Sequence, residues 1–142
     1  MIERESWKIV ELIIRRYPYK KKEYEEYISE IMASSPAAGV TITDSEDYSK
    51  PQSVTEAKAL KMNSVYADRL KKQIEAVELV YNNLRPEEQK VMRIRFWTDR
   101  YKKTPYLKMK SVSYSERQMK RIVKKIIVRV GKYIGEIPPD EQ

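Results

Sequence analysis

The segment from Ser115 to Tyr133 constrains the fold more than any other part of the chain, because a helix start signal precedes an unbroken helical pattern. Ser115 and Gln118 have capping-box spacing, in which each side chain can bond the other residue's backbone N–H. Apolar residues then recur at steps of three and four, a pattern that buries one side of a helix. They are Met119, Ile122, Val123, Ile126, Val130 and Tyr133. The segment is therefore predicted to be an amphipathic helix.

The opposite side of this predicted helix is basic. Its cations are Arg117, Lys120, Arg121, Lys124, Lys125, Arg129 and Lys132. The chain has 29 Lys and Arg against 21 Asp and Glu, and residues 100–133 hold 12 of those bases with one acid, whereas the charges before residue 100 balance. Such a confined basic excess indicates a polyanion-binding surface, since each neutralised phosphate releases counterions.

Helical periodicity also covers the N-terminal third of the chain. A first helix, ending at Tyr17-Pro18, is predicted from Trp7, Val10, Ile14 and Tyr17 with Ile9 and Ile13 beside them. A second is predicted from about Lys21 to Ala33. The helical pattern is lost between Ser34 and Pro51, where the composition is typical of a loop. Within this loop, Val40-Thr41-Ile42 is a candidate short strand.

Two further start signals follow the loop. Ser53-Val54-Thr55-Glu56 has the capping-box form and predicts a long helix. Its core or dimer contacts are expected at seven-residue spacing, on Asn63, Leu70, Val77 and Leu84, with Tyr66, Ile74 and Tyr81 adjoining. Pro86 then begins another helix through about Trp97. Its apolar side is expected to hold Val91, Met92, Ile94 and Phe96.

Thr104-Pro105 is a cap followed by a proline, which predicts a short supporting helix to Val112. Its buried candidates are Leu107, Met109 and Val112, and Ser113-Tyr114 is the expected turn. The expected fold is thus all-α, with a C-terminal helix-turn-helix. The predicted division is an N-terminal helical hairpin (1–33), a linker (34–52), a long central helix (53–84), a helix-turn-helix domain (85–135) and an acidic tail (136–142).

In a helix-turn-helix, the first turns of the second helix enter the major groove of DNA. Arg is suited to guanine and Gln to adenine, so Arg117, Gln118 and Arg121 are the predicted base-reading residues. The predicted phosphate contacts are Lys102, Lys103, Lys108, Lys110, Ser115, Lys120, Lys124 and Lys125. A solvated basic face on a helix that only closes a bundle, and a basic helix lying on a membrane, are the alternatives.

Two motifs in the sequence resemble known families. The region-4 helix-turn-helix of sigma factors is similar to Leu84-x-Pro86, Val91-x-x-Ile94-Arg95-Phe96-Trp97 and the later Ser115-Glu116-Arg117-Gln118. Leu107 to Val112 lacks that motif's usual Ile-Ala-x-x-Leu pattern. A second motif resembles the phage RinA/ArpU family of late-gene transcriptional regulators. It is Lys50-Pro51-x-Ser53-Val54-Thr55-Glu56-x-Lys58-Ala59. This resemblance implies a phage or prophage regulator in bacterial cytoplasm, acting on double-stranded DNA, with RNA polymerase as an expected partner.

Other classes of function remain as alternatives. A phage small terminase subunit also joins a helix-turn-helix to an oligomerising helical region, and a ring of about eight or more subunits would favour it. A helical adaptor would bind partners through the 53–84 stripe. No Cys or His is present, so catalysis would have to rest on carboxylates, Lys, Tyr or Ser. The carboxylate cluster to weigh is Glu23, Glu25, Glu26 and Glu30. Neighbouring lysines make these a typical exposed charged face, and we expect no enzyme, no metal, no cofactor and no membrane span.

Overall fold

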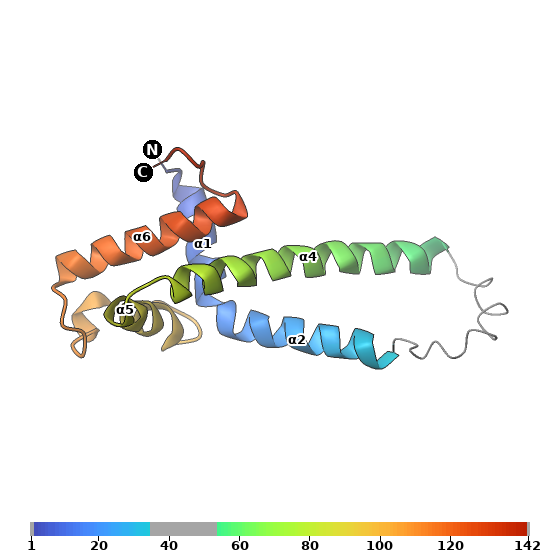
Figure 1. The fold of residues 1–142 in the computed structure, drawn as a ribbon, viewed down its shortest axis with the longest axis horizontal. Helices are drawn as coiled ribbons and strands as arrows, with labels where there is room; N and C mark the ends of the chain where they lie inside the picture. Colours follow the sequence, from blue (N-terminus) through green and yellow to red (C-terminus); the bar gives the residue numbers. More distant parts are fainter. Residues whose placement is uncertain (1, 35–53, 142) are drawn as a thin grey trace. The chain divides into compact units, whose positions relative to one another are not determined.

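The computed structural model describes residues 2–34 and 54–141, with the backbone only for Ser34 and for 54–63. The described chain is all-helical, as predicted, and contains no strand (Figure 1). Its elements are α1 (Arg4–Arg15), α2 (Tyr17–Ser34), α4 (Val54–Asn82), α5 (Pro86–Trp97), the 3-10 turn η1 (Tyr106–Lys108) and α6 (Glu116–Ile134). The predicted strand Val40-Thr41-Ile42 and the predicted cap Ser53 lie outside the described residues.

The chain forms two compact units. The larger unit holds residues 1–19 and 72–142, and the smaller holds residues 20–71. In the larger unit α1 packs against both α6 and α5, and η1 packs against α6 (Figure 1). The first helix of the chain therefore shares its core with the last one, a long-range pairing that the sequence pattern did not predict.

One apolar cluster fills the larger unit. Its completely buried members include Val10 and Ile14 from α1, Phe96 from α5 and Ile126 from α6. Trp97 joins three helices at the cluster's margin, because its Nε1 donates to the Ile14 carbonyl at 2.7 Å and its ring lies 5.2 Å from that of Tyr17 and 5.6 Å from that of Tyr81. Burial of this apolar surface is the main stabilising contribution to the fold.

The junction of α1 and α2 differs from the prediction. The second helix begins at Tyr17 rather than at Lys21, because Pro18 occupies its first turn instead of ending the helix before it. A proline is tolerated there, since the first N–H groups of a helix have no intrahelical acceptor. α1 ends at Arg15, two residues before the predicted end.

The long helix and its successor largely follow the prediction. α4 begins at Val54 and ends at Asn82, and Leu70, Val77 and Leu84 are buried as expected. Ile74 is buried and Tyr66 is half exposed, whereas the Asn63 side chain lies outside the described residues. α5 begins at Pro86 as expected, with Val91, Met92 and Phe96 buried and Ile94 half-buried.

The predicted supporting helix from Thr104 to Val112 is wrong. Only the turn η1 forms there, and backbone groups near both ends of the segment are bonded to α5. The Thr104 N–H donates to the Arg95 carbonyl, and the Thr104 carbonyl accepts from the Arg95 guanidinium at 2.8 Å. The Ser111 carbonyl accepts from Lys90 Nζ at 2.8 Å. The structure does not confirm the helix-turn-helix, because its expected first helix is absent.

The same segment corrects one of the predicted core residues. Met109 and Val112 are buried as expected, but Leu107 is 77% exposed. A 3-10 turn has about three residues per turn, so it distributes side chains differently from the α-helix assumed for this segment. The loop before α6 is therefore held by two apolar anchors and by its bonds to α5.

The chain after α6 folds back on the helix. Gly135 ends α6 in the left-handed conformation at φ 80°, and the N–H groups of Glu136 and Ile137 both donate to the Gly131 carbonyl. This arrangement returns the chain across the helix end. Ile137 is 1% exposed and lies over Gly131, where a Cβ atom would meet Ile137 Cδ1 at 2.4 Å. The predicted acidic tail thus contributes a core residue.

The smaller unit contains a polar group of three side chains. Tyr66 donates from its hydroxyl to Glu23 at 2.8 Å, and Lys20 Nζ lies 3.2 Å from the same carboxylate and 3.3 Å from the Tyr66 oxygen. Burial lowers the pKa of Lys20, but the bonds to Tyr66 and Glu23 outweigh it and raise that pKa overall. Glu23 is thus occupied by a local network within this unit.

Candidate nucleic-acid interface

The first turn of α6 is fixed by the predicted capping box. The Gln118 N–H donates to Ser115 Oγ at 3.2 Å, and the Ser115 N–H donates to Gln118 Oε1 at 2.9 Å. These bonds satisfy two backbone donors at the start of the helix. The capping box therefore fixes the backbone at the start of α6, from which the side chains of the next two turns extend.

The exposed side of α6 is basic in its first half. Arg117, Lys120, Arg121 and Lys124 recur at steps of three and four and are all exposed, while Met119, Ile122 and Ile126 on the other side are buried. We call these four residues the basic face. Lys120 pairs with Glu116 one turn earlier at 3.3 Å, an exposed pair that salt and solvent weaken. The other three have no bonded partner among the described residues.

The basic face ends after Lys124. The next position in line with it is Val128, which is only 8% exposed, and Ile127 and Gly131 on the same half of the helix are also buried. Ile137 covers Gly131 there. The structure therefore separates the basic side into two parts, and Arg129 and Lys132 do not belong to the basic face.

The three predicted base-reading residues differ in their surroundings. Arg117 and Arg121 are exposed and extend from the first turns of α6. Gln118 is exposed too, but its Oε1 is bonded within the capping box. Paired reading of adenine uses both the oxygen and the nitrogen of the amide, so Gln118 would have to give up the cap. Its base-reading role stays a prediction that competes with its structural one.

The predicted phosphate contacts also divide. Lys102, Lys108, Lys110 and Lys124 are exposed. Lys103 instead lies 2.7 Å from Glu11 of α1, and Lys125 lies 2.6 Å from Glu88 of α5. Both of these pairs are partly buried and join elements of the larger unit. These pairs give Lys103 and Lys125 a structural role within the larger unit.

Glu88 is the only buried charged residue among those whose burial the structure describes. Burial raises the pKa of its carboxyl group. The hydrogen bonds from Lys125 Nζ and from the Arg85 N–H, and the positive charges of the Lys125 and Arg85 side chains, outweigh burial and lower that pKa overall. The folded state thus favours the carboxylate. Glu88 holds the start of α5 against the middle of α6.

Tyr106 connects the loop to the basic face. The Arg95 guanidinium lies 3.9 Å from the centre of its ring, and Lys120 Nζ lies 5.8 Å from it. Burial raises the pKa of the Tyr106 hydroxyl group although Arg95 opposes the shift. Leu107 and Lys108 follow Tyr106 and are exposed. The loop therefore exposes Leu107, which the sequence pattern had assigned to the core, next to the exposed Lys108.

Two predicted absences concern metal and membrane. Among the residues that the structure describes, no group of three or more acidic side chains is placed to hold a metal ion. None of the described helices is long and apolar enough to cross a membrane. Glu23, from the acidic group weighed as a catalytic alternative, is bonded to Tyr66 and Lys20.

The fold and the site together define an all-helical protein that exposes a capped basic helix beside a basic loop. Comparison of the chain with protein-family models, with curated proteins and with solved structures finds no match. The case for a function therefore depends on the residues and their geometry, together with the sequence motifs quoted above.

Proposed function

We propose that the chain is a sequence-specific DNA-binding transcriptional regulator that inserts the first two turns of α6 into the major groove. The observation that carries the proposal is the basic face, four exposed cations on consecutive turns of a helix whose opposite side is buried. An α-helix fits the major groove, and exposed Arg side chains there can bond two acceptors of guanine.

The loop before α6 supplies the expected backbone contacts. Lys102, Lys108 and Lys110 are exposed, and Tyr106 lies between α5 and the basic face. Phosphate contacts of this kind fix the register of a protein on the duplex but read no sequence themselves. In this proposal, a rigid loop takes the position that the first helix has in a helix-turn-helix.

The biological setting is proposed from the motifs in the sequence. The resemblance to the RinA/ArpU family supports a phage or prophage regulator that activates late genes in the bacterial cytoplasm. Host RNA polymerase and a second copy of the chain, joined through residues 53–84, are the proposed protein partners.

The proposal is tested by selecting bound duplexes from a random library. The native chain should enrich one motif, and Arg117→Ala and Arg121→Ala should each cost roughly 1–3 kcal/mol on that motif and relax the preference at one base pair. Lys8→Ala on α1 is the matched control, since Lys8 is exposed and outside the basic face. Equal losses on the selected motif and on random duplex would contradict base reading by these two residues.

A further inference from the structure

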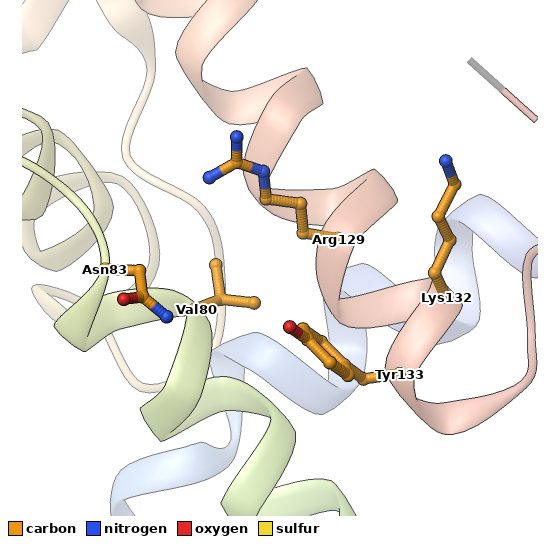
Figure 2. Close-up of a pocket in the computed structure, with 5 residues that line it drawn as sticks. All are labelled: Val80, Asn83, Arg129, Lys132 and Tyr133. Atoms are coloured by element: carbon orange, nitrogen blue, oxygen red, sulfur yellow. The ribbon is translucent and has the colours of Figure 1, made fainter. Parts of the chain in front are cut away.

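A pocket lies between the end of α4 and the last turns of α6 in the larger unit. Its volume is about 470 Å³, and its lining residues are Val80, Asn83, Arg129, Lys132 and Tyr133. Figure 2 shows the Tyr133 side chain extending from α6 toward Val80 and Asn83 on α4, with Arg129 on the preceding turn of α6. A pocket of this size suits a small organic molecule.

The chemistry of the lining is that of an anion site with an apolar wall. Arg129 and Lys132 are one turn apart on α6, and no carboxylate lines the pocket. Neither cation has a hydrogen bond or an ion pair to any described residue. Two unneutralised cations on one helix face repel one another, and an anion bound between them would remove that repulsion.

Tyr133 supplies the second observation. The helical pattern placed it with the buried residues of α6, but the structure leaves it 57% exposed at the pocket. Its exposed ring offers an apolar surface to the pocket, beside the buried Val80. Aromatic rings stack on nucleobases of any sequence, because every base has a π-face.

Asn83 adds a polar group at the end of α4. Its amide nitrogen donates to the Leu79 carbonyl at 2.9 Å, which fixes the side chain. The amide oxygen then remains as an acceptor for a ligand. A fixed acceptor, an aromatic surface and two cations together match a flat polar ring that is joined through a sugar to a doubly charged phosphate.

We propose that this pocket binds a nucleoside monophosphate, with the phosphate between Arg129 and Lys132 and the base against Tyr133. The inference is independent of the proposed DNA contact, because neither cation belongs to the basic face. Binding there would bridge α4 and α6, and would stabilise the folded chain by mass action.

The test is calorimetric titration of the full chain with AMP, with adenosine and inorganic phosphate as partial ligands. AMP should bind at least tenfold more tightly than either of them. Arg129→Gln and Lys132→Gln should each weaken AMP binding by roughly tenfold, the loss typical of one charge-assisted hydrogen bond. Tyr133→Leu should weaken AMP and adenosine while leaving the affinity for phosphate unchanged.

Lys124→Gln is the matched control, since it removes one exposed α6 cation outside the pocket, and its affinity for AMP should equal that of the native chain. Thermal unfolding of each variant without ligand verifies that the fold is retained. No binding of AMP, equal affinities for AMP and inorganic phosphate, or undiminished binding of AMP by both Arg129→Gln and Lys132→Gln would overturn the proposal. DNA binding through the basic face could hold in each of these cases, so the two proposals fail separately.

Discussion

At the scale of single residues, Gly131 lies so close to Ile137 that a side chain at position 131 has no room. A Cβ atom at position 131 would lie 2.4 Å from Ile137 Cδ1 and 2.7 Å from Cγ1. Gly→Ala inside a helix is ordinarily favourable by about 1 kcal/mol. We expect Gly131→Ala to lower the free energy of unfolding instead, by roughly 1–3 kcal/mol, because overpacking outweighs helix propensity.

Urea denaturation measures this effect, and the double variant Gly131→Ala with Ile137→Ala separates its causes. With the isoleucine removed, the added methyl group has room, so the change at position 131 should cost less than it does in the native background. A single variant Gly131→Ala that is more stable than the native chain would show that Ile137 does not pack there.

Glu88 gives a prediction for pH dependence. Its folded pKa is lowered below the ordinary value of 4.5, so its contribution is complete at pH values well above 4.5 and is lost as the pH falls through the folded pKa. Glu88→Gln should therefore lower stability at pH 7 by roughly 1–3 kcal/mol, since it removes a charged partner of Lys125. The stability of the variant should also fall less steeply below pH 5.

Unfolding curves at pH 7 and at intervals down to pH 3 test this prediction. Glu116→Gln is the control, because its pair with Lys120 is exposed and should contribute little. Parallel pH profiles for the native chain and Glu88→Gln would mean that the pair with Lys125 does not lower the pKa of Glu88.

At the scale of elements, the capping box at Ser115 controls how well the first turn of α6 is formed. Ser115→Ala removes the acceptor for the Gln118 N–H and should cost about 1 kcal/mol, whereas Ser115→Gly should cost only a few tenths. Urea denaturation gives both values, and faster amide exchange at Gln118 should accompany the alanine variant. If alanine and glycine at this position have the same effect, the capping interaction is not the cause.

The elements also show what the sequence could and could not predict. The start of α5 at Pro86 and the start of α6 at Ser115 were predictable, because a local proline and a local capping box determine them. The segment after Thr104 was not, because its backbone groups are bonded to Arg95 and Lys90 on another helix. The one sequence signal against a helix in this segment was the absence of the Ile-Ala-x-x-Leu pattern.

The candidate site follows the same distinction. The exposure of Arg117, Arg121 and Lys124 could be read from helical spacing alone. The end of the basic face could not, because Val128 and Gly131 are covered through contacts distant in the sequence. The pairs of Lys103 with Glu11 and of Lys125 with Glu88 likewise depend on how α1 and α5 pack against the C-terminal region.

At the scale of the whole molecule, the central claim is that the chain binds duplex DNA through the basic face. Each lysine at a phosphate contributes about one released counterion, so it steepens the salt dependence of binding by about 0.9. Lys124 is exposed on the basic face, and Lys8 on α1 is an exposed lysine outside it. The two residues therefore form a matched pair for a test of location.

The most direct measurement is the dissociation constant of a duplex between 50 and 200 mM salt, for the native chain, Lys124→Gln and Lys8→Gln. The account predicts a steep native slope of log Kd against log salt, a slope lower by about one for Lys124→Gln, and the native slope for Lys8→Gln. A native affinity that is independent of salt, or the same slope for the native chain and Lys124→Gln, would contradict it.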